Sequence, residues 1–235
     1  MMETKPLHKI PRETLEHLLS GIPFFKVVRQ QDLKQFELLL QASRVVSYLP
    51  GEVVLQKGES GNWLYFLLKG KLAVYVDQAL KGDLINYVTP GEVFGDLAQL
   101  MGQARTATVI ADSGAKESMV LALDFNVFGP LNSVSPISRQ TKLAYYRNTA
   151  HNLRWKLEVY RSQHLHHELA NKHRQIKLYV GPKDTYEELA SLYQQSQSLA
   201  LLLLEWNKEF GVLSAEALSQ ASPTVISSSQ SHPLS

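Results

Sequence analysis

Residues 90–108 read Pro90-Gly91-Glu92-Val93-Phe94-Gly95-Asp96-Leu97-Ala98-Gln99-Leu100-Met101-Gly102-Gln103-Ala104-Arg105-Thr106-Ala107-Thr108. This stretch places an acid, Asp96, at the expected start of a short helix, and an arginine, Arg105, nine residues later. An arginine can donate a forked, charge-assisted pair of hydrogen bonds to a phosphate. A carboxylate only accepts hydrogen bonds, so it suits a sugar hydroxyl. The pair therefore predicts a site for the sugar–phosphate part of a nucleotide.

Short apolar segments with glycine at most corners surround this stretch. They predict strands at 45–49, 53–55, 63–68, 72–76, 84–88, 106–111 and 119–123. Residues 1–11 are expected to be a loose end. Helical spacing predicts helices at 12–19 and 31–41 and a short helix at 124–131. The apolar segment Ile22-Pro23-Phe24-Phe25 is expected to break the first helix. Strands of this length and spacing are typical of a β-sandwich or barrel with Greek-key or jelly-roll connections.

The C-terminal half predicts two long helices. Ser135-Pro136 opens the first, and Gly181-Pro182 ends it; the second runs from Tyr186 to Phe210, with Gly211 after it. An apolar stripe at spacings of 3 and 4 marks the first helix: Leu143, Tyr146, Ala150, Leu153, Leu157 and Tyr160. The stripe fits either a homodimer seam through the long helix 137–177 or packing on the chain's own barrel. We expect three regions: 12–134, 135–212, and a disordered Ser/Pro/Gln-rich tail at 213–235.

Residues 22–131 resemble the cyclic nucleotide-binding domain family. The resemblance is carried by Leu49–Val54, by Gly58-Glu59 with Tyr65–Leu72, and by Gly91–Ala98 with Arg105–Thr108. It implies an α+β fold, a β-jelly-roll domain with N-terminal helices and a C-terminal helical extension, and cAMP or cGMP as ligand, without a cofactor. It also implies that Arg105 pairs with the cyclic phosphate, helped by backbone N–H groups at Leu97 and Ala98, and that Asp96 accepts from the ribose 2′-hydroxyl. The ligand-binding residues expected from the resemblance are Gly95, Asp96, Leu97, Ala98, Arg105, Thr106 and Ala107.

Two positions bear on ligand choice. The family usually has glutamate where this chain has Asp96, whose carboxylate is one methylene shorter; binding can then be normal, weakened or altered, or absent in a pocket that serves as scaffold. Thr106 follows the arginine, where related domains that favour cGMP often place threonine. The family's C-terminal helix often caps the base, so Leu143 and Tyr145 or Tyr146 are candidate lids.

The composition excludes several classes of chemistry. The chain has no cysteine, so thiolate catalysis, thiolate metal sites and disulfides are ruled out. No serine nucleophile pattern, P-loop or dinucleotide fingerprint appears, and no metal site is predicted. The apolar run at 199–204 is too short to span a bilayer, which predicts a soluble, cytoplasmic protein.

The charge distribution and the C-terminal half leave three function classes. Between residues 137 and 180 lie nine Lys or Arg and two acids, which we interpret as a solvated basic face, so a nucleic-acid partner is not expected. No helix-turn-helix follows residue 180. The sequence predicts a non-enzymatic receptor that relays nucleotide binding through its C-terminal helices to a partner or dimer interface. The alternatives are an adaptor with a degenerate pocket and a transcription regulator of the cAMP-receptor type.

Overall fold

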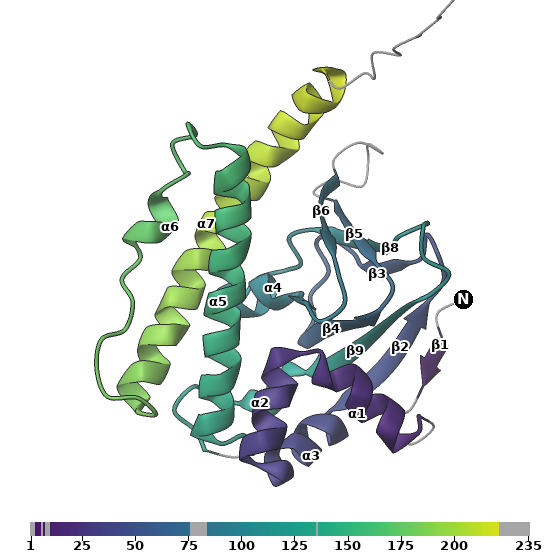
Figure 1. The fold of residues 1–235 in the computed structure, drawn as a ribbon, viewed down its shortest axis with the longest axis vertical. Coiled ribbons are helices and arrows are strands. Elements are labelled where there is room, and N and C mark those ends of the chain that lie inside the picture. Colours follow the sequence, from purple (N-terminus) through teal and green to yellow (C-terminus); the bar gives the residue numbers. More distant parts are fainter. Residues whose placement is uncertain (1–2, 6, 8–9, 76–83, 135, 221–235) are drawn as a thin grey trace, which may run out of the picture.

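Two antiparallel sheets form the centre of the computed structural model, which describes residues 3–5, 7, 10–75, 84–134 and 136–220 (Figure 1). The first sheet has the order β1-β2-β9-β4-β7 and the second has the order β3-β8-β5-β6. The strand bounds are β1 Glu3–Lys5, β2 Ser43–Tyr48, β3 Val53–Leu55, β4 Trp63–Lys69, β5 Leu72–Tyr75, β6 Leu84–Val88, β7 Val93–Phe94, β8 Thr108–Ala111 and β9 Ser118–Asp124. The predicted jelly-roll architecture is confirmed.

Each face of the first sheet packs against a different layer. Alternate side chains of β4 point to opposite faces, so Tyr65 and Leu67 join the core between the two sheets, while Leu64 and Phe66 join the core on the other side. In the inter-sheet core Tyr65 stacks on Phe94, with ring centroids 5.3 Å apart. The second core continues through the N-terminal helices and the C-terminal helices without a break.

Three helices, α1 Arg12–Ser20, α2 Pro23–Gln31 and α3 Leu33–Gln41, precede the sheets. The predicted break at Ile22–Phe25 is confirmed, because α1 ends at Ser20 and Ile22 is extended; the sequence did not predict that a new helix, α2, begins at Pro23. Pro23 occupies the first turn of α2, where its missing N–H leaves no helical hydrogen bond unmade. The expected loose end is corrected in part, since β1 pairs with residues Val45–Ser47 of β2.

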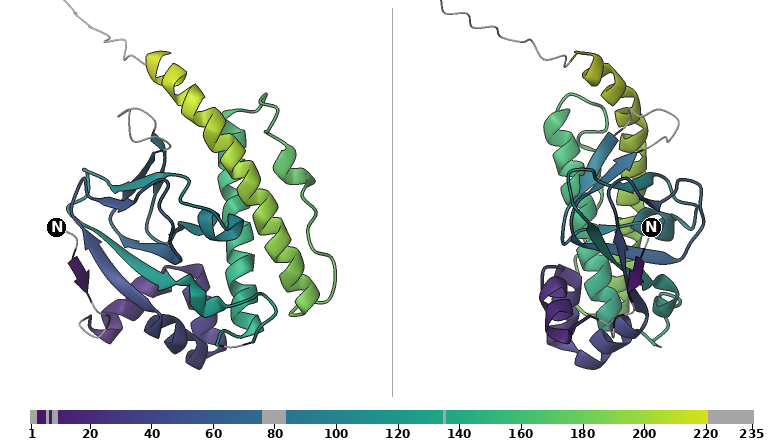
Figure 2. Two further views of the ribbon diagram at one scale, coloured as in Figure 1. Left: turned by 180° about the vertical axis from the view of Figure 1, so that it is seen from behind. Right: turned by 90° about the vertical axis from the view of Figure 1, so that its right-hand side faces the viewer.

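The C-terminal part consists of η2 Phe125–Phe128, α5 Arg139–Gln163, the short helix α6 Lys172–Gln175, and α7 Tyr186–Gln220. Figures 1 and 2 show α5 and α7 side by side and running in the same direction, with the segment that contains α6 returning along their outer side. Two sequence predictions are wrong here. The first helix stops at Gln163 rather than near 177, and α7 passes through Gly211 to Gln220. Residues 221–235 of the predicted tail lie outside the described residues.

The apolar stripe of α5 is buried inside its own chain. Tyr146 meets Tyr193 of α7 with ring centroids 5.5 Å apart, and Tyr160 meets Trp206 of α7 at 6.0 Å. Trp206 is fully buried, and the ring of His167 lies 4.8 Å from it. Packing within one chain therefore accounts for the stripe, and the assignment of these side chains to a dimer seam is wrong.

Candidate functional site

A tight turn between β7 and the short helix α4 Asp96–Met101 forms the start of the site. Gly95 occupies this turn with φ of +77°, a conformation that side chains with a Cβ rarely adopt. A Cβ at this position would lie 2.8 Å from Nη1 of Arg105. Glycine is therefore required both for the turn and for the close approach of the arginine.

Arg105 is buried at the base of the site, with 6% of its surface exposed. Its Nη1 donates to the Gly95 carbonyl at 2.6 Å, and its Nη2 donates to the carbonyls of Trp63 at 2.6 Å and Gly61 at 3.3 Å. Burial lowers the pKa of Arg105, while Tyr65 and nearby carboxylates oppose that shift; arginine nevertheless stays charged in proteins. These contacts hold the positively charged guanidinium of Arg105 in one orientation.

Asp96 is also buried, with 3% of its surface exposed. Burial raises the pKa of its carboxyl group, and the positive charge of Lys156, hydrogen bonds from the backbone N–H groups of Asp96 and Leu97, and the charge of Arg105 oppose the shift. The N–H group of Leu97, expected to assist a phosphate, therefore already donates to Asp96. Lys156 belongs to α5, so the electrostatic surroundings of Asp96 include a helix outside the β-strand region.

All of the expected site residues line one cavity of about 90 Å³. They are Gly95, Asp96, Leu97, Ala98, Arg105, Thr106 and Ala107. The strands contribute apolar walls, including Val74 of β5 and Val109 of β8. The structure thus brings together all seven ligand-binding residues that the resemblance implies.

Residues of the C-terminal helices close this cavity, and sequence reasoning missed them. They are Lys156 and Tyr160 of α5, and Leu203 and Asn207 of α7. The two residues on each helix are four positions apart, so they lie on the same face of that helix. That spacing alone does not predict which face of the helix meets the sheets. The candidate lids Leu143, Tyr145 and Tyr146 are wrong. None of them lines the cavity; Tyr145, for example, packs against Phe128 in the core next to the helices, with ring centroids 5.1 Å apart.

A second cavity of about 450 Å³ adjoins the first between the β6–β7 connection and α5. The two cavities share the lining residues Asn86, Tyr87, Lys156 and Tyr160. Burial raises the pKa of Tyr160 to about 12, although a hydrogen bond from Asn86 opposes the shift. Near pH 7 the Tyr160 hydroxyl is therefore protonated and uncharged, and its side chain lines both cavities.

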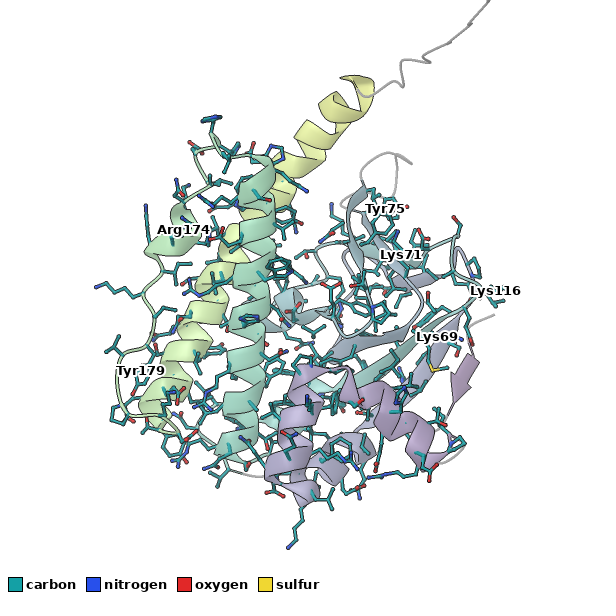
Figure 3. The ribbon with its side chains drawn as sticks, in the orientation of Figure 1. Lys69, Lys71, Tyr75, Lys116, Arg174 and Tyr179 are labelled. Atoms are coloured by element: carbon teal, nitrogen blue, oxygen red, sulfur yellow. The ribbon has the colours of Figure 1, made fainter. Side chains whose placement is uncertain are left out.

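The outer side of the helical pair carries a separate ionic cluster. Glu158 of α5 lies 2.9 Å from Nε2 of the buried His173 and 2.9 Å from Arg174. These partners lower the pKa of Glu158 to about 2, with the His173 hydrogen bond as the largest cause. In Figure 3, Arg174 lies on the side of α5 and α7 away from the sheets, whereas Lys69, Lys71 and Lys116 lie at the opposite side of the molecule. These cations do not share a face.

Within the described ranges, no group of three His, Asp or Glu side chains is placed to hold a metal ion. None of the helices that the structure describes combines the length and the hydropathy that a membrane crossing requires.

Comparison with known proteins identifies residues 45–129 as a match to the model of the cyclic nucleotide-binding domain. The chain is 30% identical over 105 residues to a cAMP-dependent protein kinase type II regulatory subunit of Drosophila melanogaster, a match that covers 44% of this chain and 26% of the relative. It is 30% identical over 112 residues to a cGMP-dependent protein kinase of Eimeria tenella, covering 43% of this chain and 10% of the relative. The match thus spans about a quarter or less of these relatives.

Two solved structures show lower similarity. The regulatory domain of Toxoplasma gondii PKA with cAMP is 20% identical, with a TM-score of 0.41 and coverage of 50% of this chain and 43% of that one. A putative cyclic nucleotide binding protein from Ruegeria pomeroyi is 18% identical, with a TM-score of 0.48 and coverage of 63% and 64%. The assignment of residues 45–129 to the cyclic nucleotide-binding domain therefore rests on the match to the family model and not on these two structures.

Proposed function

Because residues 45–129 form a cyclic nucleotide-binding domain, we propose that this chain is a non-enzymatic receptor for cAMP or cGMP whose C-terminal helices respond to the ligand. One observation carries the proposal: a single cavity is lined both by Arg105 and Asp96 and by residues of α5 and α7. A ligand in this cavity would touch the nucleotide-binding strands and the helices at the same time.

Arg105 and Asp96 are the polar groups that would hold the sugar and phosphate. Arg105 is fixed by backbone carbonyls and carries a charge suited to the cyclic phosphate. The Asp96 carboxylate would accept a hydrogen bond from the ribose 2′-hydroxyl. Gly95, Leu97, Ala98, Thr106 and Ala107 would line the remaining surface around this part of the ligand.

The size of the cavity supports a movement of the helices on binding. A volume of about 90 Å³ holds several water molecules but is well below the roughly 300–1,000 Å³ typical of small-molecule sites. Lys156 and Tyr160 separate it from the neighbouring 450 Å³ cavity. Outward displacement of these two side chains would join the cavities and shift α5.

Contacts between α5 and α7 would pass that movement to α7: the ring centroid of Tyr160 lies 6.0 Å from that of Trp206. The short helix α4 also contacts α7, since Gln197 donates to the carbonyl of Leu100 at 3.1 Å. A ligand that binds the open arrangement better than the closed one shifts the population of the two by its difference in affinity. The receptor would thereby change the surface that α5 and α7 present to a partner protein.

A second candidate, an adaptor with a vestigial pocket, is favoured by one observation. In the structure Arg105 already donates to three carbonyls, and the Leu97 N–H donates to Asp96. A pocket whose donors already have acceptors within the protein can persist as a purely structural element.

Isothermal titration calorimetry with cAMP and cGMP separates these candidates, with cyclic di-GMP and non-cyclic AMP as comparison ligands. A receptor binds cAMP or cGMP and loses affinity for the 2′-deoxy analogue by about ten- to a hundredfold, because one charged hydrogen bond contributes roughly 1.5–3 kcal/mol. The 2′-deoxy analogue probes Asp96 without altering the protein. Absence of heat, and of any thermal shift at millimolar nucleotide, would favour the adaptor.

A further inference from the structure

The segment between α6 and α7 crosses the outer side of the helical pair without forming a helix or a strand. Figures 1 and 2 show it as a drawn-out coil beside α5 and α7. Ile176, at its start, has extended backbone angles, with φ of −71° and ψ of 112°. We call residues 177–181 the outer segment.

Side-chain hydrogen bonds anchor the chain at both ends of the outer segment. Before it, Nη2 of Arg154 in α5 donates to the carbonyl of Ile176 at 3.0 Å. After it, the carbonyl of Pro182 accepts from the Tyr179 hydroxyl at 3.1 Å and from the Thr185 hydroxyl at 3.2 Å. The segment is therefore held in place before any partner binds, which lowers the entropic cost of binding.

Between these anchors the backbone of the outer segment is unpaired. Within the described part of the chain, no N–H or carbonyl group of residues 177–181 makes a hydrogen bond. Unpaired backbone groups along an extended segment can form a ladder with another extended chain, as the exposed edge of a sheet does. The outer segment thus has the backbone chemistry of a free strand edge.

The side chains of the outer segment alternate in exposure. Leu178 and Val180 are 68% and 95% exposed, whereas Tyr179 between them is half-buried. Lys177 and Lys183 are exposed, and among the described residues neither has a carboxylate partner. The segment therefore presents two apolar side chains with a lysine on either side of them.

We propose that the outer segment is a docking site for an acidic, extended segment of a partner protein, which adds to it as a β-strand. Apolar side chains of the partner pack on Leu178 and Val180. Its carboxylates lie beside Lys177 and Lys183, which gives the contact charge complementarity. Phosphates of a nucleic acid or a lipid also attract lysine, but they offer acceptors and leave the carbonyls of the segment without donors.

The docking site is separate from the nucleotide cavity. No residue of the outer segment lines the cavity that contains Arg105 and Asp96. The inference therefore goes beyond the proposed function and does not depend on it.

Fluorescence polarisation of the full chain tests the proposal with short labelled peptides in which glutamate alternates with valine, leucine or phenylalanine. A peptide with lysine in place of glutamate tests the charge. Two further peptides, N-methylated on the odd or on the even residues, each lose the backbone donors along one edge and keep every side chain. Hydrogen exchange of residues 177–181, with and without peptide, reports backbone pairing directly.

Lys177→Glu reverses one charge of the docking site. Lys116→Glu makes the same change at an exposed position on the opposite side of the molecule (Figure 3) and is the matched control. We expect Lys177→Glu to weaken binding of the acidic peptides by about fivefold, the range of one cross-strand charge pair. Lys116→Glu should leave the affinity unchanged.

We expect the acidic peptides to bind and to slow exchange of the amides of residues 177–181. The lysine peptide should not bind, and one of the two N-methylated peptides should lose binding. Absence of binding by every acidic peptide, binding that leaves these amides unprotected, or undiminished binding of both N-methylated peptides would overturn the inference. Protection of the same amides by duplex DNA or by phosphatidylserine vesicles, and not by the peptides, would also overturn it. Nucleotide binding, which calorimetry measures separately, is unaffected by any of these outcomes.

Discussion

Replacing Arg105 by lysine tests whether this side chain stabilises the fold before any ligand binds. The guanidinium donates to the carbonyls of Gly95, Trp63 and Gly61 from a buried position. A lysine keeps the charge but has a single nitrogen in place of the planar fork, so we expect it to retain one of the two short hydrogen bonds. Since a hydrogen bond to a charged group contributes roughly 1.5–3 kcal/mol, the free energy of unfolding should fall by about 2–3 kcal/mol.

Urea unfolding, followed by circular dichroism, measures this change. Arg44→Lys is the matched control, because Arg44 is exposed and its guanidinium lies 4.2 Å from the centroid of the Trp63 ring. An exposed cation–π contact contributes about 0.5–1 kcal/mol, so the control should lose less than that. The dependence on urea concentration should be the same in all three proteins. Equal stability of the two variants would refute the structural role given to Arg105.

Three further substitutions test individual charged side chains. Burial raises the pKa of Asp96, so the stability of the ligand-free protein falls as pH rises above the ordinary value of 3.8. Asp96→Asn should therefore raise the free energy of unfolding near pH 7 and flatten its pH dependence, which urea titrations at several pH values measure. The same variant should weaken nucleotide binding in calorimetry. Lys142→Met removes the hydrogen bonds from Nζ to the carbonyls of Pro130, at 2.5 Å, and Ser133, at 2.7 Å, and should cost about 2–3 kcal/mol in thermal unfolding because buried carbonyls lose their partners. Glu158→Gln should lower the free energy of unfolding by at most about 1 kcal/mol, because solvent screens a partly exposed carboxylate. The stability difference between the variant and the unaltered chain should be complete above pH 4.5 and vanish as pH falls toward 2. Urea midpoints at several pH values measure this dependence.

The nucleotide-binding strands could be predicted because their signals are local. The acid and the arginine lie in one stretch of 19 residues at positions 90–108, and glycines mark the turns between short strands. The seven predicted ligand-binding residues all lie in that same stretch, so neighbours in the sequence line the cavity together.

The helical wall of the cavity could not be predicted, because its signals depend on tertiary contacts. A stripe at spacings of 3 and 4 shows that a helix is buried on one side, but not whether the partner is a second copy or another helix of the chain. The sequence predicts a helix end at Gly211, yet a glycine inside a helix costs only about 1 kcal/mol, and α7 continues through it. The first helix ends at Gln163 with neither glycine nor proline beside it.

The three tryptophans of the chain give it an intrinsic optical signal. Trp206 is enclosed beside Tyr160 and immediately precedes Asn207, whereas Trp155 is 63% exposed and Trp63 lies under Arg44. An enclosed indole emits at shorter wavelength than a hydrated one, so any displacement of α7 that admits water shifts the emission of Trp206. With Trp63 and Trp155 replaced by phenylalanine, the colour of the remaining fluorescence would report, without any attached dye, whether the cavity is open or closed.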